Sequence, residues 1–121
     1  MSKKILVVDD EMHLAKIIQF TLEHAGYRTS IAFDGGEALA MVQEENPDLV
    51  ILDLMLPGVD GYKVCNILKK DANLKHIPVI ILSARDFESE VLAEPVSADL
   101  LMQKPFNTEE LLSQISRLME N

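Results

Sequence analysis

Polar side chains capable of chemistry follow four apolar segments of this chain, close to the point where each segment ends. Two acids follow the first segment, and an acid, a hydroxyl group and an ammonium group follow three later ones: Asp9, Asp10, Asp53, Ser83 and Lys104. If the apolar segments are parallel strands of one sheet, these side chains meet at the carboxyl ends of the strands, where open α/β sheets bind ligands. The expected cluster holds three carboxylates, one hydroxyl and one ammonium group.

Three neighbouring carboxylates repel one another, and burial raises their pKa values further. A divalent cation or a lysine relieves that repulsion, and Mg²⁺ is typically bound through one or two carboxylates together with phosphate oxygens. A carboxylate beside such an ion can attack phosphorus and form an aspartyl phosphate. Lys104 and the Ser83 hydroxyl offer a charge and a hydrogen-bond donor to the transferred oxygens. The residue types therefore indicate phosphoryl transfer onto Asp53.

The apolar segments have the character of buried β-strands. Residues 5–8, 49–52 and 79–82 are continuously apolar and rich in β-branched side chains, which is typical of strands covered on both faces by helices. Residues 27–33 are more polar and predict an edge strand, and residues 99–102 predict a fifth strand. Four strands and a weaker edge strand are thus expected in one sheet.

Helical patterns alternate with these strands. Helix starts are predicted at Asp34, Asp60 and Asn107, and helix ends at Gly26 and at residues 46–47. Strict alternation of strands and helices predicts a doubly wound α/β fold with a parallel sheet and right-handed crossovers.

The third helix has an apolar stripe that we expect to face the core. Val64, Ile67 and Leu68 form this stripe, and Cys65 lies near it as an inert buried residue. Because Cys65 is the single cysteine of the chain, an internal disulfide and a multi-thiolate metal site are excluded.

Length and charge narrow the function further. The 121 residues suit one domain spanning 1–121, and the formal net charge of −9 argues against nucleic-acid binding. The apolar residues 5–8 near the N-terminus are too few for a signal peptide or a membrane span. A cytoplasmic protein without a membrane segment is therefore expected.

Four segments together resemble the receiver domain of bacterial two-component response regulators, over essentially the whole chain. They are residues 5–11, 52–61, 78–84 and 104–106. The resemblance implies a flavodoxin-like (βα)5 fold with a five-stranded parallel sheet in the order 2-1-3-4-5 and five helices. It also implies a phosphoacceptor switch rather than an enzyme in the ordinary sense. The implied partners are a histidine kinase or phosphotransfer protein and a downstream output domain or protein.

The same resemblance assigns a metal site. Asp53 is implied as the phosphoacceptor and as a direct ligand of Mg²⁺, for which Mn²⁺ can substitute. Asp10 and the backbone carbonyl of Met55 are implied as further direct ligands, and Asp9 as a ligand through a water molecule.

Residues implied to hold the phosphoryl group come from the later strands. Lys104 pairs with the acceptor carboxylate and then with the phosphoryl group, Ser83 reorients to hydrogen-bond it, and Ala84 lends a backbone donor. A cis peptide bond between Lys104 and Pro105 is implied, and it would aim the lysine inward.

Residues 86–102 depart from the family pattern. Pro95 would interrupt a helix and biases Glu94 away from helical angles, so a short or displaced fourth helix ending by about Glu94 is expected. Ser97 stands where the family has glycine, and Leu101 stands where it has an aromatic residue. A non-standard output surface over this helix and the fifth strand is predicted, with a locally repacked helix as the alternative.

Ordinary roles exist for each site residue taken alone. Asp9 and Asp10 could complement a helix dipole, Asp53 could cap a turn, Ser83 could satisfy local backbone groups, and Lys104 could be a solvated loop residue. Two other functions compete with the switch: a pseudo-receiver serving as a constitutive interaction module, and a flavodoxin-like FMN carrier. The retained acids and lysine argue against the first. Repulsion between the acids and a flavin phosphate argues against the second.

Overall fold

The computed structural model describes residues 3–83 and 98–119 of the chain. Within these ranges the order of elements is β1 (Lys4–Val8), α1 (Met12–His24), β2 (Arg28–Ala32), α2 (Gly35–Glu45), β3 (Leu49–Asp53), α3 (Gly61–Lys70), β4 (Val79–Ser83), β5 (Leu100–Gln103) and α4 (Thr108–Met119). The helix predicted to end by about Glu94, together with Pro95 and Ser97, lies outside the described residues. The four described helices are α1, α2 and α3, which precede residues 84–97, and α4, which follows them.

The five strands form one parallel sheet in the order β2-β1-β3-β4-β5. This confirms the expected flavodoxin-like topology, with the polar strand β2 at an edge. The chain runs from β1 outward to β2 and then returns to place β3 on the other side of β1. The strand order thus reverses between β1 and β3, and a ligand crevice is expected at their carboxyl ends.

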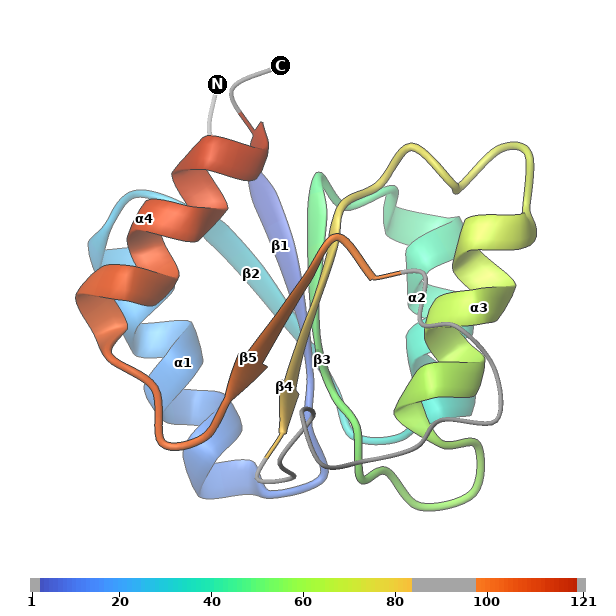
Figure 1. Ribbon diagram of the computed structural model, residues 1–121, viewed down its shortest axis with the longest axis horizontal. Helices are drawn as coiled ribbons and strands as arrows, with labels where there is room; N and C mark the ends of the chain where they lie inside the picture. The colour runs from blue at the N-terminus through green and yellow to red at the C-terminus, as the bar shows by residue number, and fades with distance from the viewer. Residues whose placement is uncertain (1–2, 84–97, 120–121) are drawn as a thin grey trace.

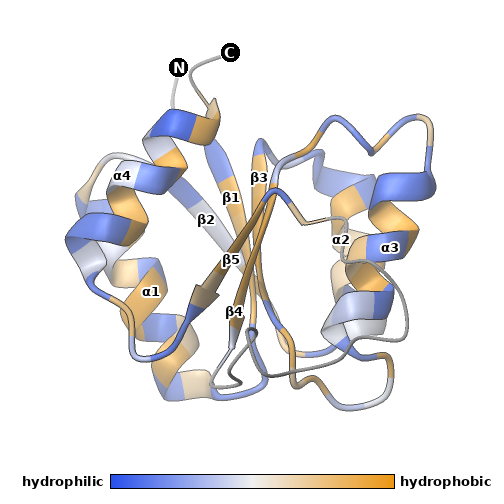
Figure 2. Cartoon of the chain, viewed as in Figure 1, coloured by the Kyte–Doolittle hydropathy of each residue, from blue (hydrophilic) through white to orange (hydrophobic). Residues whose placement is uncertain are grey.

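Helices cover both faces of the sheet. Figure 1 shows α1 and α4 on one side and α2 and α3 on the other, with both chain termini at the opposite end from the strand arrowheads. Alternate strand residues face different layers: Ile5 and Val7 pack with α1 and α4, whereas Leu6 and Val8 pack with α2 and α3. Two apolar surfaces per strand explain the unbroken apolar segments of the sequence, which appear as the hydrophobic centre of Figure 2.

The predicted helix starts are confirmed as N-caps. Side-chain oxygens of Asp34, Asp60 and Asn107 accept hydrogen bonds from backbone N–H groups in the first turns of α2, α3 and α4. At α2 the Glu37 carboxylate also accepts from the Phe33 N–H at 2.9 Å, so the acid reaches back across the start of the helix. These bonds satisfy N–H groups that have no partner within the helix.

The stripe predicted for α3 needs one correction. Val64, Cys65 and Leu68 are buried, but Ile67 is 43% exposed. The buried stripe centres on the side of Cys65, and at 100° per residue Ile67 is turned away from that centre. Cys65 is therefore a full member of the core.

Burial raises the pKa of the Cys65 thiol from 9.0 to about 11. We expect Cys65 in the native protein to react with a disulfide reagent at about pH 8 at least about 100-fold more slowly than in the urea-unfolded chain, because the thiolate is the nucleophile. Absorbance of the released thiol follows both rates. Equal rates in the two states would contradict the buried, high-pKa thiol.

A polar cluster links the sheet edge to the end of α2. The Glu45 carboxylate forms an ion pair with the Lys4 ammonium group and accepts a hydrogen bond of 2.7 Å from the Ser30 hydroxyl. Lys4 and then Ser30 lower the pKa of Glu45 from its ordinary value of 4.5. The ionised carboxylate therefore stabilises the folded state above pH 4.5, and this contribution is lost as the pH falls through the lowered pKa.

Glu45→Gln is expected to lower the free energy of unfolding at neutral pH by about 0.5–1 kcal/mol, the range for partly exposed ion pairs. At an acidic pH the difference from wild type should shrink, because the carboxyl group becomes protonated in the folded state as well once the pH falls through its lowered pKa. Urea unfolding at the two pH values measures the effect. Glu44→Gln, which changes the net charge equally at an exposed neighbour, is the control, and an equal loss in both variants would disprove the role of the cluster.

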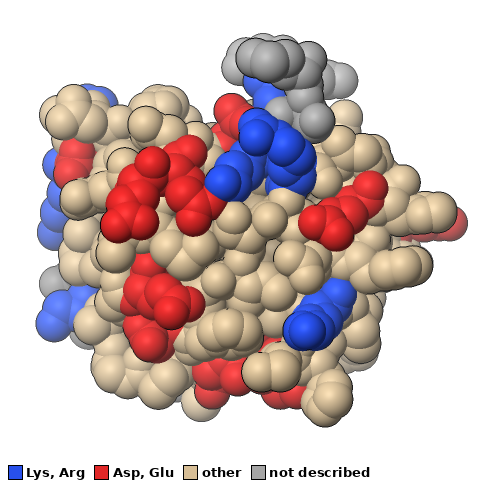
Figure 3. Space-filling model, turned by 180° about the vertical axis from the view of Figure 1, so that it is seen from behind, with Lys and Arg blue, Asp and Glu red and all other residues tan. Residues whose placement is uncertain are grey.

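Two general properties of the described residues are their lack of a membrane-spanning helix and the distribution of their charges. Among the described residues, no helix combines the length and the apolar character needed to cross a bilayer. On the face seen in Figure 3, one group of basic side chains lies near the top, with acidic side chains to either side of it. Acidic residues outnumber basic ones in the whole chain, which gives the formal net charge of −9.

Candidate functional site

The carboxyl end of β1 contributes two acids with different surroundings. Asp9 follows the strand directly, its backbone N–H donates to the Ala32 carbonyl, and its side chain is almost completely buried. One Asp9 oxygen accepts a 2.9 Å hydrogen bond from the Glu11 N–H, whereas Asp10 is exposed. This sharp turn directs the Asp9 carboxylate inward and leaves Asp10 at the mouth of the site.

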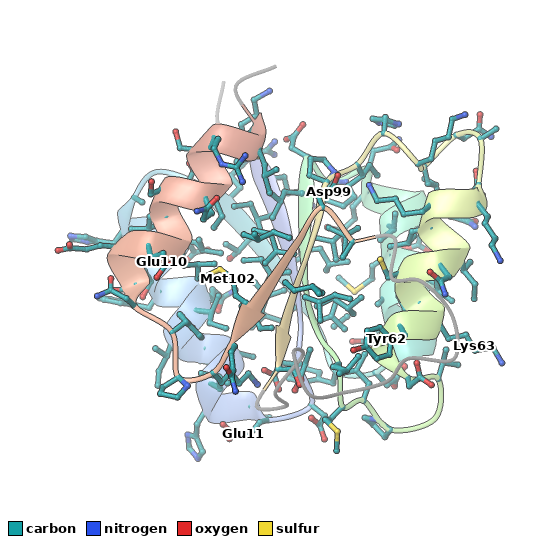
Figure 4. The ribbon with its side chains drawn as sticks, viewed as in Figure 1. Glu11, Tyr62, Lys63, Asp99, Met102 and Glu110 are labelled. Atoms are coloured by element: carbon teal, nitrogen blue, oxygen red, sulfur yellow. The ribbon has the colours of Figure 1, made fainter. Side chains whose placement is uncertain are left out.

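Glu11 ends this turn and begins the helix. Its carboxylate accepts hydrogen bonds from the N–H groups of His13 and Leu14 at 3.1 and 3.0 Å, which makes it the N-cap of α1. Of the three consecutive acids, Glu11 is therefore the one that caps the helix, while Asp9 and Asp10 precede it. Figure 4 shows Glu11 at the carboxyl end of the sheet and Asp99 at the opposite end.

The carboxyl end of β3 contributes Asp53. Asp53 is the last residue of its strand, is paired in register with Leu82, and is buried. Its Oδ1 atom accepts a hydrogen bond of 3.2 Å from the backbone N–H of Met55. The carboxylate is thus fixed by the loop that follows it.

These three acids form one cluster. Carboxylate oxygens of Asp9, Asp10 and Asp53 all lie within 4.8 Å of one another. They are hard oxygen donors in a partly buried, partly open position, which is the donor set that Mg²⁺ prefers. The residues therefore fit the magnesium ion that the sequence predicted, with Asp10 on the open side.

Lys104 reaches the cluster from the end of β5. Its Nζ atom lies 3.4 Å from Oδ2 of Asp9 and 3.4 Å from Oδ2 of Asp53. The peptide bond between Lys104 and Pro105 is cis, and the Lys104 N–H donates to the Ser83 carbonyl at 2.6 Å. The sequence resemblance paired Lys104 with Asp53, whereas the structure places the ammonium group between Asp53 and Asp9.

The negative charges of the three carboxylates exceed the positive charge of Lys104 in this cluster. Burial raises the pKa of Asp9, and the nearby Asp53 carboxylate raises it further. The Glu11 N–H and the Lys104 ammonium group act in the opposite direction but do not outweigh burial. One lysine against three carboxylates leaves negative charge that a divalent cation would neutralise.

Two other predicted site residues follow β4. Ser83 is the last residue of that strand and is buried, and its register partner on β5 is Gln103, next to Lys104. Ser83 therefore lies one residue position from the lysine across the sheet. Ala84 lies outside the described residues.

Comparison with known proteins places the chain in a family. A family model of the response regulator receiver domain matches residues 5–116. The chain belongs to the receiver domain family of response regulators. This membership removes the FMN carrier as an alternative.

Solved structures of receivers have the same fold. The receiver domain of the Francisella response regulator 1452 is 36% identical, with a TM-score of 0.87 and coverage of 98% of each chain. The chemotaxis response regulator CheY4 of Vibrio cholerae is 31% identical, with a TM-score of 0.88 and coverage of 98% of this chain and 99% of that one. NtrX from Brucella abortus is 33% identical, with a TM-score of 0.86, over 99% of this chain but 27% of its own length.

Leu101 occupies the position on β5 where the family pattern has an aromatic residue. It pairs with Ile81 and is 37% exposed. Leu100 and Met102 belong to the apolar layer beneath α1 and α4, so Leu101 faces the other side of the sheet. Figure 4 shows Met102 directed into the space between β5 and α4.

Proposed function

We propose that this receiver accepts a phosphoryl group on Asp53 in a magnesium-dependent reaction and thereby changes a protein-interaction surface. The observation that carries the proposal is the convergence of Asp9, Asp10 and Asp53 within 4.8 Å, with the Lys104 ammonium group between two of them. A pseudo-receiver has no need for this complete set.

The donor is a phosphohistidine on a histidine kinase or a phosphotransfer protein. A carboxylate oxygen of Asp53 attacks phosphorus, a P–O bond forms, and the P–N bond to the donor imidazole breaks with its electron pair left on nitrogen. Burial of Asp53 keeps competing water away from the nucleophile, and the Met55 N–H bond fixes its orientation.

Residues of the cluster divide the remaining tasks. Asp10, Asp53 and the Met55 carbonyl would hold Mg²⁺, with Asp9 acting through water, and Mn²⁺ would serve in its place. When bound, the ion neutralises charge on the phosphoryl oxygens. Lys104 then exchanges its contact with Asp53 for one with a phosphoryl oxygen, which keeps a cation beside the transferred group.

The phosphorylated state ends when water attacks phosphorus and releases inorganic phosphate from Asp53. The chain is thus a phosphoacceptor with self-catalysed gain and loss of the group, and it turns over no separate substrate. Ser83 and the Ala84 N–H would bind the phosphoryl group and transmit its presence to the segment that follows β4.

An output domain or a separate protein receives the signal. The chain matches 27% of the length of NtrX, so a domain of this fold can form part of a longer chain. Because Leu101 replaces the usual aromatic residue, we place the output surface over β5 and the segment before it in a non-standard form. The proposed location is the cytoplasm, where histidine kinases deliver phosphoryl groups.

Intact-mass measurement tests the function. The wild-type protein incubated with a small acyl phosphate and Mg²⁺ is expected to gain the mass of one phosphoryl group, and chelation of the metal should prevent the gain. A protein that stays unmodified with both reagents present would refute the proposal.

A further inference from the structure

The loop of residues 54–60 connects the phosphoacceptor to α3 and carries the Met55 carbonyl. It leaves β3 directly after Asp53, and the Met55 N–H donates to the Asp53 carboxylate at 3.2 Å. Leu54 and Leu56 bury their side chains in the core beneath α2 and α3. A displacement of this loop would therefore move the Met55 carbonyl and disturb the hydrogen bond that orients the Asp53 carboxylate.

Gly61 brings the first turn of α3 into close contact with the root of this loop. Its N–H donates to the Leu54 carbonyl at 2.9 Å. A Cβ atom added at Gly61 would lie 2.5 Å from the Asp53 carbonyl oxygen and 2.7 Å from the Leu54 Cα atom, whereas ordinary contact begins at 3.4 Å. Both obstructing atoms belong to the backbone, so no side-chain rotation can make room.

Gly35 brings the first turn of α2 against the far end of the same loop. A Cβ atom there would lie 2.7 Å from the Val59 carbonyl oxygen and 2.9 Å from Cγ2 of Val64. The first obstructing atom is again backbone. The loop is thus enclosed by two helix N-termini, one at each end.

The other three glycines of the chain have no comparable role. Gly26 and Gly58 have positive φ angles of +100° and +75°, with no atom within 4 Å of an added Cβ. Gly36 follows Gly35 in the same helical turn, yet its added Cβ would meet the nearest atom, an Asp34 oxygen, at an ordinary 3.5 Å. Close approach to the loop is therefore specific to Gly35 and Gly61.

We propose that Gly35 and Gly61 are positioning residues for the metal site, because their missing side chains let α2 and α3 fix the loop that carries Met55. Neither glycine has a side chain that could bind the ion or the phosphoryl group. The inference rests on the proposed function, since it concerns the metal site of that same reaction. Sites of this kind lose affinity when their supporting residues shift their ligands.

Metal titration of Gly35→Ala and Gly61→Ala tests this role without phosphorylation. Calorimetry with Mn²⁺ is expected to show affinity about tenfold weaker than in wild type for both variants, in the range for supporting residues of metal sites. Gly36→Ala, the matched control, should bind Mn²⁺ within about twofold of wild type and should not lose thermal stability, because alanine favours a helix.

A second readout separates positioning from general destabilisation. In the metal-free state, the Met55 amide resonance should shift in Gly35→Ala and Gly61→Ala, because its bond to Asp53 is disturbed. Ile115→Val removes a methylene from a fully buried residue of α4 in the other apolar layer. This variant should lose stability while keeping wild-type Mn²⁺ affinity and the wild-type Met55 resonance.

Each outcome decides the inference. Wild-type affinity in both folded glycine variants overturns it, and so does an equal loss in Gly36→Ala or Ile115→Val. If Gly35→Ala does not fold, the double variant Gly35→Ala/Val64→Ala is titrated instead. It removes one obstruction but retains the Val59 oxygen, so unchanged affinity there also overturns the inference. Wild-type protein that binds no Mn²⁺ would refute the proposed function as well, whereas normal wild-type binding with unaffected glycine variants refutes this inference alone.

Discussion

Asp53→Asn is expected to abolish phosphorylation by a small acyl phosphate in the presence of Mg²⁺. The amide keeps the size of the carboxylate and can still accept the Met55 hydrogen bond, but it is not a nucleophile toward phosphorus. Intact-mass spectra should show a phosphorylated wild-type protein and an unmodified variant. The expected change is a loss of the full signal rather than a reduced rate.

Asp71→Asn provides a matched control for Asp53→Asn. Asp71 accepts a 2.8 Å hydrogen bond from the Asn73 N–H near the end of α3, which an asparagine oxygen can also accept. This variant removes the same charge outside the acidic cluster and should be phosphorylated like wild type. Phosphorylation of Asp53→Asn to the wild-type extent would show that another residue is the acceptor.

Asp10→Ala is expected to weaken Mg²⁺ and Mn²⁺ binding by at least about tenfold, since even supporting residues of metal sites contribute that much. Asp10 is the exposed member of the cluster, and its removal leaves too few oxygens to hold an ion that gives up water reluctantly. Calorimetric titration with each metal measures the loss. Unchanged affinity would exclude Asp10 as a ligand.

The metal-free Asp10→Ala protein should unfold at a higher temperature than metal-free wild type. One of three mutually repelling carboxylates is gone, while the contacts of Lys104 with Asp9 and Asp53 are kept. Glu11→Gln removes the adjacent charge from outside the cluster, so it should leave metal affinity near the wild-type value. Thermal unfolding in a chelator, followed by titration, tests both properties in the same samples.

Most helices and strands could be predicted from the sequence, because helix caps and apolar spacing depend on residues only a few positions apart. Asp34, Asp60 and Asn107 accept from N–H groups two or three positions ahead, so their helix starts could be predicted locally. Ile67 was placed wrongly for the same reason. Apolar spacing allowed two neighbouring stripes on α3, and contact with the sheet selected the one that contains Cys65.

The clustering of the site residues could also be predicted from the sequence, because parallel strands bring their carboxyl ends to one edge of the sheet. This predicted that Asp9, Asp10, Asp53, Ser83 and Lys104 would lie together, and the structure places the three acids and the lysine in one cluster. The capping role of Glu11 was missed. Its position three residues before Leu14, at the start of an apolar helical pattern, was the signal that could have revealed it.

Only the tertiary structure decided how those groups meet. Lys104 and Asp9 are 95 positions apart, and the ammonium group reaches both Asp9 and Asp53 because the register of β4 and β5 places Lys104 beside the ends of the neighbouring strands. Likewise, nothing local distinguishes Gly35 from Gly36, yet only Gly35 lies against the loop. The sequence by itself determined which chemical groups gather at the sheet edge, since alternation and strand ends are local properties. Distances between those groups depend on packing among distant segments, so they were decided by the fold.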